Sequence, residues 1–287
     1  MPYTKKSSFS RKFFMQKYNV SEQNFKKAAI TWDELLAIKM HFESHQGFFK
    51  NFSNEILNSM NMCGAIHSVK VRIKNSEHLI EKIIRKNIES INDPDAGAHI
   101  SYDNYTETLN DIIGIRVLHL FKDDWVPIHS FIRENFPLAS TPCAYIREGD
   151  LKNIIDAYEK NGCIVLKHPF GYRSVHYVTF NENKTLRAEI QVRTLFEEAW
   201  SEIDHTLRYP YFLDDEILKT YSLMLNRLAG SADEVSTYIK IIKAEIENMK
   251  YDSVEKNIDF LEIIEKKNKE IEELRSRLEK AEASNCK

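Results

Sequence analysis

One apolar run with an arginine inside it, DIIGIRVLHLF at residues 111–121, constrains the fold of this chain most strongly. Near-continuous apolar residues over this length are the pattern of a buried strand. Arg116 is costly to bury unless its guanidinium is paired or bound to a ligand, or unless it lies at a strand end and reaches the surface. Gly114 marks either a bulge or a close approach to the backbone.

Alternating apolar and polar residues indicate further strands at 65–74, 163–167, 174–180 and 186–194. The tetrapeptide NENK at 181–184 suits a hairpin turn before the last of these. Helical patterns lie before and between the strands. Thr31, in a capping box with Glu34, and Ser76 are the expected caps of two helices, and further helical segments lie near 48–62, 123–135 and 150–160. Four or five strands interleaved with helices predict an α+β (mixed α/β) domain.

The composition excludes several classes of protein. The 287 residues are 43% hydrophobic and 29% charged with a net charge of −3, which argues against coating nucleic acid by bulk charge. No stretch approaches the roughly 20 apolar residues of a membrane span, and the N-terminus has no apolar signal region. Because the four cysteines show no C-x-x-C spacing, we expect reduced thiols, a cytoplasmic location and no membrane partner.

Polar residues gather in three segments near the predicted strands. Arg72, Lys74 and Lys82 lie in VRIKNSEHLIEK, Asp111 precedes the buried run, and Lys167, Tyr172, Ser174 and His176 lie in KHPFGYRSVHYV. A solvated basic edge and a structural tyrosine with a satisfied histidine are the simpler explanations. The alternative is a ligand site, because an aromatic ring, a hydroxyl and an imidazole in line can stack a base and bond its sugar or phosphates.

The stretch AEIQVRTLFEEAWSEIDH, residues 188–205, changes from strand to helical spacing without a break. Glu189, Gln191 and Arg193 share one face of its strand. In its helical half we expect Leu195, Ala199 and Ile203 to pack inward, whereas Glu198 and His205 share a different face.

Two carboxylates, Asp111 and Glu189, each lie at a strand with basic residues at hand. Magnesium is usually held by one or two carboxylates together with substrate phosphates. Charge to offset those phosphates is available from Lys74, Lys82, Lys167 and Arg193. This combination favours phosphoryl-type transfer, in which positioning and charge stabilisation carry most of the catalysis.

Four motifs in this order, RIKNSEHLIEK, DIIGIRV, GYRSVH and EIQVRTLFEEAW with EIDH, resemble the synthetase domain of the RelA/SpoT alarmone synthetases, especially the small single-domain forms. The likeness covers about residues 40–210. It implies a nucleotidyltransferase-like mixed sheet flanked by helices. It also implies transfer of the β,γ-pyrophosphate of ATP to the 3′-hydroxyl of GTP or GDP, with Mg²⁺, to make the alarmone (p)ppGpp of the stringent response.

The resemblance assigns a role to each matching residue. Arg72 and Arg116 would sandwich the adenine, and Lys74 and Lys82 would hold the ATP phosphates. Asp111 and Glu189 would bind magnesium, with Glu189 also a candidate base. The remaining residues would complete the nucleotide sites: Gln191 for ATP, and Lys167, Tyr172 (guanine stacking), Ser174, His176, Arg193, Glu198 and His205 for the acceptor.

The chain departs from the family pattern at three places. His78 stands where small members usually have serine, and Glu198 where they commonly have asparagine. Lys167 lies four residues before Gly171 rather than three. Two other functions therefore stay open. One is a toxin-type relative that pyrophosphorylates the 3′ end of tRNA, which the basic residues Lys5, Lys6, Arg11 and Lys12 fit. The other is a non-catalytic nucleotide-sensing module.

We expect three regions along the chain. Residues 1–40 form a basic, helical N-terminal extension, 41–211 the RelA/SpoT-like synthetase domain, and 212–287 a helical C-terminal extension. This last region has apolar residues at a three–four spacing that Asn268 and Arg275 interrupt. They are Val254, Ile258, Leu261, Ile264, Ile271 and Leu278. That spacing indicates a short coiled coil or a surface helix, and a homo-oligomer through terminal helices is one expectation.

Overall fold

A six-stranded mixed sheet forms the centre of the computed structural model, which describes residues 9–93, 97–150, 152–208 and 215–285. The strands lie in the order β1-β2-β6-β5-β3-β4. The pairs β2–β6 and β3–β4 are parallel and the other three are antiparallel. The strands are β1 (Ser68–Ile73), β2 (Ile113–His119), β3 (Cys143–Ile146), β4 (Ile164–Lys167), β5 (Ser174–Phe180) and β6 (Arg187–Thr194).

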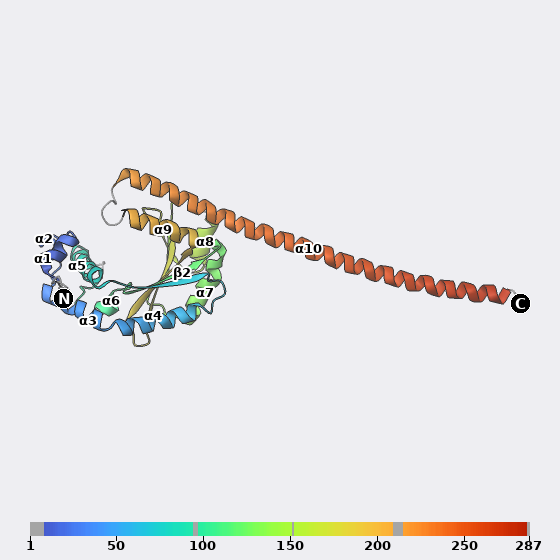
Figure 1. Ribbon diagram of the computed structural model, residues 1–287, viewed down its shortest axis with the longest axis horizontal. Coiled ribbons are helices and arrows are strands. Elements are labelled where there is room, and N and C mark those ends of the chain that lie inside the picture. The colour runs from blue at the N-terminus through green and yellow to red at the C-terminus, as the bar shows by residue number, and fades with distance from the viewer. Residues whose placement is uncertain (1–8, 94–96, 151, 209–214, 286–287) are drawn as a thin grey trace, which may run out of the picture. The chain divides into compact units, whose positions relative to one another are not determined.

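Helices cover both sides of this sheet, with α4 on one side and α9 on the other (Figure 1). The α+β class predicted from the sequence is confirmed. The helices are α1 (Arg11–Lys17), α2 (Glu22–Lys27), α3 (Trp32–Ser44), α4 (Gln46–Met60), α5 (Ser76–Asn92), α6 (Tyr105–Thr108), a 3₁₀ turn (Lys122–Asp124), α7 (Trp125–Asn135), α8 (Lys152–Lys160), α9 (Leu195–Arg208) and α10 (Glu216–Asn285).

Side-chain alternation gives the sheet one apolar and one polar face. Ile115, Val117, Ile190 and Val192 are buried on the apolar face. On the polar face Gly114 pairs with Arg72 on one side and with Glu189 on the other, and Arg116 pairs with Gln191. Because Gly114 has no side chain, the polar face has an open floor between Arg72 and Glu189.

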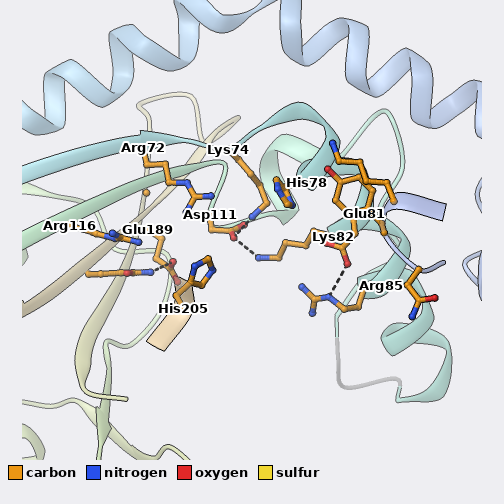
Figure 2. A pocket seen from close by; sticks show the side chains of 15 residues that line it. Arg72, Lys74, His78, Glu81, Lys82, Arg85, Asp111, Arg116, Glu189 and His205 are labelled. Atoms are coloured by element: carbon orange, nitrogen blue, oxygen red, sulfur yellow. Dashed lines mark hydrogen bonds and ion pairs between the residues drawn. The ribbon is translucent and has the colours of Figure 1, made fainter. Parts of the chain in front are cut away.

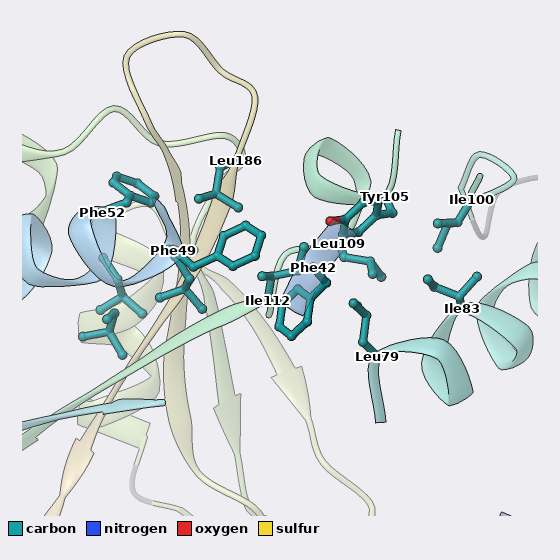
Figure 3. Close-up of a cluster of buried hydrophobic side chains, with 14 of the residues drawn as sticks. Phe42, Phe49, Phe52, Leu79, Ile83, Ile100, Tyr105, Leu109, Ile112 and Leu186 are labelled. Atoms are coloured by element: carbon teal, nitrogen blue, oxygen red, sulfur yellow. The ribbon is translucent and has the colours of Figure 1, made fainter. Parts of the chain in front are cut away.

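The hydrophobic core continues from the sheet toward α3, α4 and α5 (Figure 3). Phe42 and Phe49 stack with ring centroids 5.0 Å apart, and Leu79 is fully buried. Such aromatic pairs contribute about 0.5–1.5 kcal/mol beyond the area that they bury. This packing fixes α5, which carries Lys82, against the end of the sheet.

Short polar contacts set where the helices begin. Thr31 caps α3 as predicted, since its hydroxyl accepts from the Glu34 N–H at 3.1 Å. The Glu34 carboxylate does not close the predicted box and accepts from the Tyr102 N–H at 3.0 Å. The prediction that Ser76 caps α5 was wrong: Asn75 is the cap, because its amide oxygen accepts from the N–H groups of residues 77 and 78. The Ser76 hydroxyl donates instead to a carboxylate of α3.

A capping box explains why β6 runs into α9 without a loop. The Glu197 N–H donates to the Thr194 hydroxyl at 3.1 Å, and the Thr194 N–H donates to the Glu197 carboxylate at 2.8 Å. This reciprocal pair satisfies donors that a helix start leaves open. The first turn of α9 is therefore joined rigidly to the last residue of β6.

Two sequence expectations about packing were wrong. The sheet has six strands rather than four or five, because the short strand β3 was not recognised. In α9 the buried residues are Glu197, Glu198, Trp200 and Arg208, whereas Ile203 is 44% exposed and Ala199 is also exposed. Arginines of β2 and β6 lie under α9 and pair with Glu198, so a carboxylate is buried there in place of the expected apolar residues.

The chain divides into two compact units, residues 1–233 and 234–287. Helix α10 contributes to both. Within the first unit, Asn226 and Asp233 are fully buried. Within the second unit, the apolar side chains of Val235, Ile239 and Ile242 are exposed. Among the described residues, no helix is both long and apolar enough to span a membrane.

Candidate nucleotide site

A pocket of about 760 Å³ opens on the polar face of the sheet, next to α5 (Figure 2). Its lining comes from β1, β2, β6, α5, α9, the end of α1 and residues that adjoin these elements. These are Lys17, Tyr18, Asn19, Arg72, Lys74, His78, Glu81, Lys82, Arg85, Asp111, Gly114, Arg116, Glu189, Gln191 and His205. The pocket thus brings together eight of the fourteen site residues expected from the sequence.

Asp111 is the centre of a charged cluster in this pocket. The ammonium groups of Lys74 and Lys82 each lie 2.7 Å from its Oδ2 (Figure 2). Burial alone would raise the pKa of Asp111, but the two lysines outweigh burial and hold that pKa below its usual value. Burial also lowers the pKa of Lys82, against the opposing effect of Asp111. The cluster therefore holds an ionised carboxylate between two lysine side chains.

The second oxygen of this carboxylate suits a cation. Asp111 Oδ1 is buried and has no hydrogen-bond partner among the described residues. A buried carboxylate oxygen without a partner is costly, and a bound cation would remove that cost. Within the same described part of the chain, no group of three or more His, Cys, Asp or Glu side chains could hold a metal alone. A cation here would need ligands from a substrate, as magnesium commonly has.

Glu189 belongs to a hydrogen-bonded chain on β6 and β5. Its Oε2 accepts from the Gln191 amide at 2.7 Å, and its Oε1 lies 3.2 Å from His176 Nδ1. His176 Nε2 lies 3.1 Å from the Tyr172 hydroxyl. Burial raises the pKa of Glu189, but the contacts with His176 and Gln191 outweigh burial and hold that pKa below its usual value. The carboxylate is therefore ionised at neutral pH.

A second charged network lies beside the pocket, where α9 crosses the sheet. Glu198 bridges two arginines: its Oε1 accepts from Arg116 at 3.0 Å and its Oε2 lies 2.9 Å from Arg193 Nε. Arg116 also donates to Glu202. The Arg193 guanidinium lies 5.4 Å from the centre of the Tyr172 ring. The arginine inside the apolar run is therefore paired, as its burial requires.

Six of the expected residues lie outside the pocket lining. Four of them adjoin the pocket. His176 contacts Glu189 and Glu198 contacts Arg116, as given above, and Gln191 Oε1 accepts from Tyr172 at 3.5 Å and from Arg193 at 3.3 Å. Ser174 is buried and donates to the Val192 carbonyl at 3.2 Å. Lys167 is an exposed residue whose ammonium group pairs with Glu148 at 2.6 Å.

One wall of the pocket was not expected from the sequence. Lys17 and Tyr18, at the end of α1, both donate to the Glu77 carboxylate, at 2.6 and 3.1 Å. The Tyr18 ring meets His78 edge-on at 5.3 Å. These contacts join residues about 60 positions apart, which no local pattern reveals. The Glu81 and Arg85 side chains on α5, 3.7 Å apart, were also missed, although Lys82 already indicated that face of the helix.

The fold and the pocket define a class of protein: a mixed α+β domain whose open polar sheet face holds two carboxylates among lysines and arginines. Such a face suits a phosphorylated ligand with a divalent cation. Comparison with known proteins leads to the same class. A sequence model described as the region found in RelA / SpoT proteins matches residues 71–213. The chain belongs to the RelA/SpoT family.

Two relatives from Bacillus subtilis (strain 168) are similar to this chain in sequence. GTP pyrophosphokinase YwaC is 24% identical over 221 residues, covering 75% of this chain and 91% of its own. GTP pyrophosphokinase YjbM is 26% identical over 190 residues, covering 63% and 74%. The crystal structure of the small alarmone synthetase 1 from Bacillus subtilis bound to its product pppGpp has a TM-score of 0.50 at 22% identity, covering 72% and 99%. It shares the fold.

Proposed function

We propose that this chain transfers pyrophosphate from ATP to the 3′-hydroxyl of GTP or GDP, making (p)ppGpp. The observation that carries the proposal is the pocket in which Asp111, Lys74 and Lys82 form one cluster beside the hydrogen-bonded Glu189. Two curated relatives are named GTP pyrophosphokinases, which supports this reaction over other phosphoryl transfers.

We assign the donor nucleotide to the pocket. Arg72 and Arg116, on neighbouring strands, would hold the adenine between their guanidinium planes, since arginine stacks well on aromatic faces. Glu198 and Glu202 hold Arg116 in place for this. Lys74 and Lys82 would exchange their ion pairs with Asp111 for the ATP phosphates. Gln191 would contact the same nucleotide from the pocket wall.

We assign Mg²⁺ to Asp111 and Glu189. The partnerless Oδ1 of Asp111 supports this choice. When bound, the ion would neutralise charge on the phosphates. The lysines hold the Asp111 carboxylate ionised, and His176 and Gln191 orient Glu189. The ionised Glu189 is also positioned to accept the proton of the attacking 3′-hydroxyl.

We assign the acceptor nucleotide to the side of the site near β5. Tyr172 would stack on the guanine, with His176 and His205 near its phosphates and ribose. Arg193, Glu198 and Ser174 support that surface, because Arg193 lies against the Tyr172 ring and Ser174 is bonded to β6. Lys167 would bind an acceptor phosphate only by exchanging its exposed pair with Glu148.

Transfer of label from [γ-³²P]ATP tests the proposal, with Mg²⁺ and GTP, GDP or bulk tRNA as acceptor. We expect labelled guanine nucleotides with the natural chain. Glu189→Gln should reduce the rate to about one per cent or less, because general-base catalysis contributes about 10²–10⁴-fold. Asp111→Asn should abolish the dependence on Mg²⁺ together with most of the rate. Tyr172→Ala should raise the KM for the acceptor; an unchanged KM would contradict guanine stacking.

The same experiment separates the two other functions. Label only in tRNA would replace the guanine nucleotide by the toxin-type reaction. Of the basic residues that fit this reaction, Lys5 and Lys6 lie outside the described residues, and Arg11 pairs with Glu22 at 2.5 Å. No label in any acceptor, with ATP still bound, would identify a nucleotide-sensing module.

We further propose that identical chains associate through α10. Within the second unit, Val235, Ile239, Ile242, Ile246 and Met249 are all about half exposed or more, at spacings of four and three. A heptad stripe of this kind buries itself against a copy of the same stripe. Leu261 and Ile264 of the previously expected stripe are also exposed. The side chains of its other four apolar members lie outside the described residues.

The three regions 1–40, 41–211 and 212–287 stay our proposal for the domain organisation, and the family match over 71–213 supports the central one. We place the reaction in the cytoplasm, where ATP and GTP are available. The unpaired thiols of Cys63, Cys143 and Cys163 support a reducing compartment.

A further inference from the structure

A buried asparagine of α10 holds the turn before β5. Asn226 is fully buried, and its Nδ2 donates to the Gly171 carbonyl at 2.8 Å. Gly171 has φ of +72°, a conformation that side chains other than hydrogen resist. Asn226 is therefore bonded to the backbone of the GYRSVH segment at the residue whose conformation directs the chain into it.

Two arginines complete this contact. Arg173 Nη2 lies 3.2 Å from the Asn226 side-chain oxygen and 3.3 Å from its carbonyl, and Arg147 Nη1 lies 3.4 and 3.3 Å from the same two oxygens. Both guanidiniums also lie 3.6 Å from Asp150 Oδ1. Hydrogen bonds from charged donors are stronger than those from neutral ones, so the two arginines hold the Asn226 side chain in one orientation.

A glycine one turn later in α10 makes room for the arginines. A Cβ at Gly230 would lie 2.9 Å from Arg173 Nη1 and 3.2 Å from Arg147 Nη1, so even alanine would displace a guanidinium. A Cβ at Gly171 would lie 3.1 Å from Asn226 Nδ2. Asn226 and Gly230 of α10 therefore pack directly against the turn at Gly171 and leave no space for a larger side chain at either glycine.

Tyr172 lies in the sequence between Gly171 and Arg173, the two residues that Asn226 contacts. Asn226 bonds Gly171 before it and Arg173 after it, and the Tyr172 hydroxyl reaches His176 at 3.1 Å. Asn226 and Gly230 both lie outside residues 71–213, the segment that matches the family. We propose that Asn226 is a positioning residue for the acceptor nucleotide: it fixes the Tyr172 turn from α10. This inference rests on the proposed function, since the acceptor is assigned to Tyr172 there.

Steady-state kinetics with three variants test the proposal. Asn226→Ala removes every bond of the side chain, and Asn226→Asp keeps the acceptor oxygens for the arginines but loses the bond to Gly171. In both we expect the KM for GTP or GDP to rise by about tenfold, the effect of about one hydrogen bond, while the KM for ATP stays within about twofold. Gly230→Ala should shift the acceptor KM in the same direction.

Asn87→Ala is the matched control. Asn87 is also fully buried, and its side chain holds a different turn through two bonds to Ile100, at 2.9 and 2.8 Å. We expect this variant to unfold at a lower temperature with an unchanged acceptor KM. An unchanged acceptor KM in both Asn226 variants, or an equal rise in both substrate KM values, would overturn the proposal.

Amide hydrogen exchange separates failure of this inference from failure of the proposed function. If the natural chain transfers label to neither GTP nor GDP, the proposed function fails by itself. In that case Asn226→Ala should still speed exchange at residues 171–173 while residues 99–101 exchange as in the natural chain. Unchanged exchange at 171–173 would show that Asn226 does not hold the turn.

Discussion

At the scale of single residues, Glu198 balances two arginines of unequal exposure. The Arg193 side chain is 1% exposed, and the Glu198 carboxylate, 2.9 Å from its Nε, compensates the buried positive charge. We expect Glu198→Ala to lower the free energy of unfolding by about 3–5 kcal/mol, the effect of leaving a buried charge unpaired. Urea denaturation measures this loss.

Glu202 provides the matched comparison, because it contacts the same Arg116 from a 43% exposed side chain. Glu202→Ala should change the free energy of unfolding by no more than about 1 kcal/mol, as for exposed ion pairs. Equal losses in the two variants would contradict the view that burial of Arg193 sets the difference.

The buried carboxylates Glu197 and Asp233 give opposite pH dependences. Burial would raise the pKa of Glu197, but Lys122 and Arg173 lower it to about 2. A lowered pKa means that the folded state binds fewer protons than the unfolded chain, so this stabilisation is present above about pH 4.5 and is lost as the pH falls toward 2. Urea unfolding between pH 2 and 5 should show the free energy of unfolding falling as the pH is lowered. Glu197→Gln should make this pH dependence shallower.

Asp233 serves as the opposite case. Burial and the neighbouring Glu197 raise its pKa to about 6. The folded state then binds more protons, and this contribution to stability falls as the pH rises from 3.8 to about 6. Asp233→Asn should therefore remove a decline in stability over that range. A steeper decline in this variant would reverse the assignment.

At the scale of elements, α1 and the turn after it form a pocket wall that one carboxylate holds to α5. Glu77 accepts from both Lys17 and Tyr18, and these bonds lower its pKa. Glu77→Gln should weaken the wall and raise the KM for ATP a few-fold, with the acceptor KM unchanged. Glu22→Gln, which weakens an exposed pair with Arg11 away from the pocket, should leave both constants unchanged.

Most strands could be predicted from the sequence, because alternation such as that of SVHYVTF matches β5 residue for residue. Strand β3 could not, since only four residues follow Pro142 before the pattern ends. The buried face of α9 was misjudged because hydropathy ranks Glu197 and Glu198 as exposed. In the folded chain Glu198 pairs with arginines of β2 and β6, and Glu197 pairs with Lys122 and Arg173, which lie outside the strands. Lys17 and Tyr18 were missed because their contact with α5 arises only in the folded chain.

At the scale of the whole molecule, the exposed stripe of α10 predicts association of identical chains. Light scattering during gel filtration should give a mass that is a multiple of the 33.7 kDa chain. Ile246→Glu should reduce this mass or weaken the association, because it places a charge in the stripe. Ala244→Glu adds the same charge at an exposed position off the stripe and should have no effect. A single-chain mass for the natural protein would reject the association.

The parallel pairing of β2 with β6 has a consequence for molecules that misfold. Gly114 stands opposite Glu189, and Arg116 stands opposite Gln191. A slip of one residue in β6 would turn Ile190 and Val192 toward the pocket and push Glu189 into the apolar core. Such a molecule would lose its stability together with its chemistry. The register of β6 against β2 therefore decides both the stability of the sheet and the composition of the pocket.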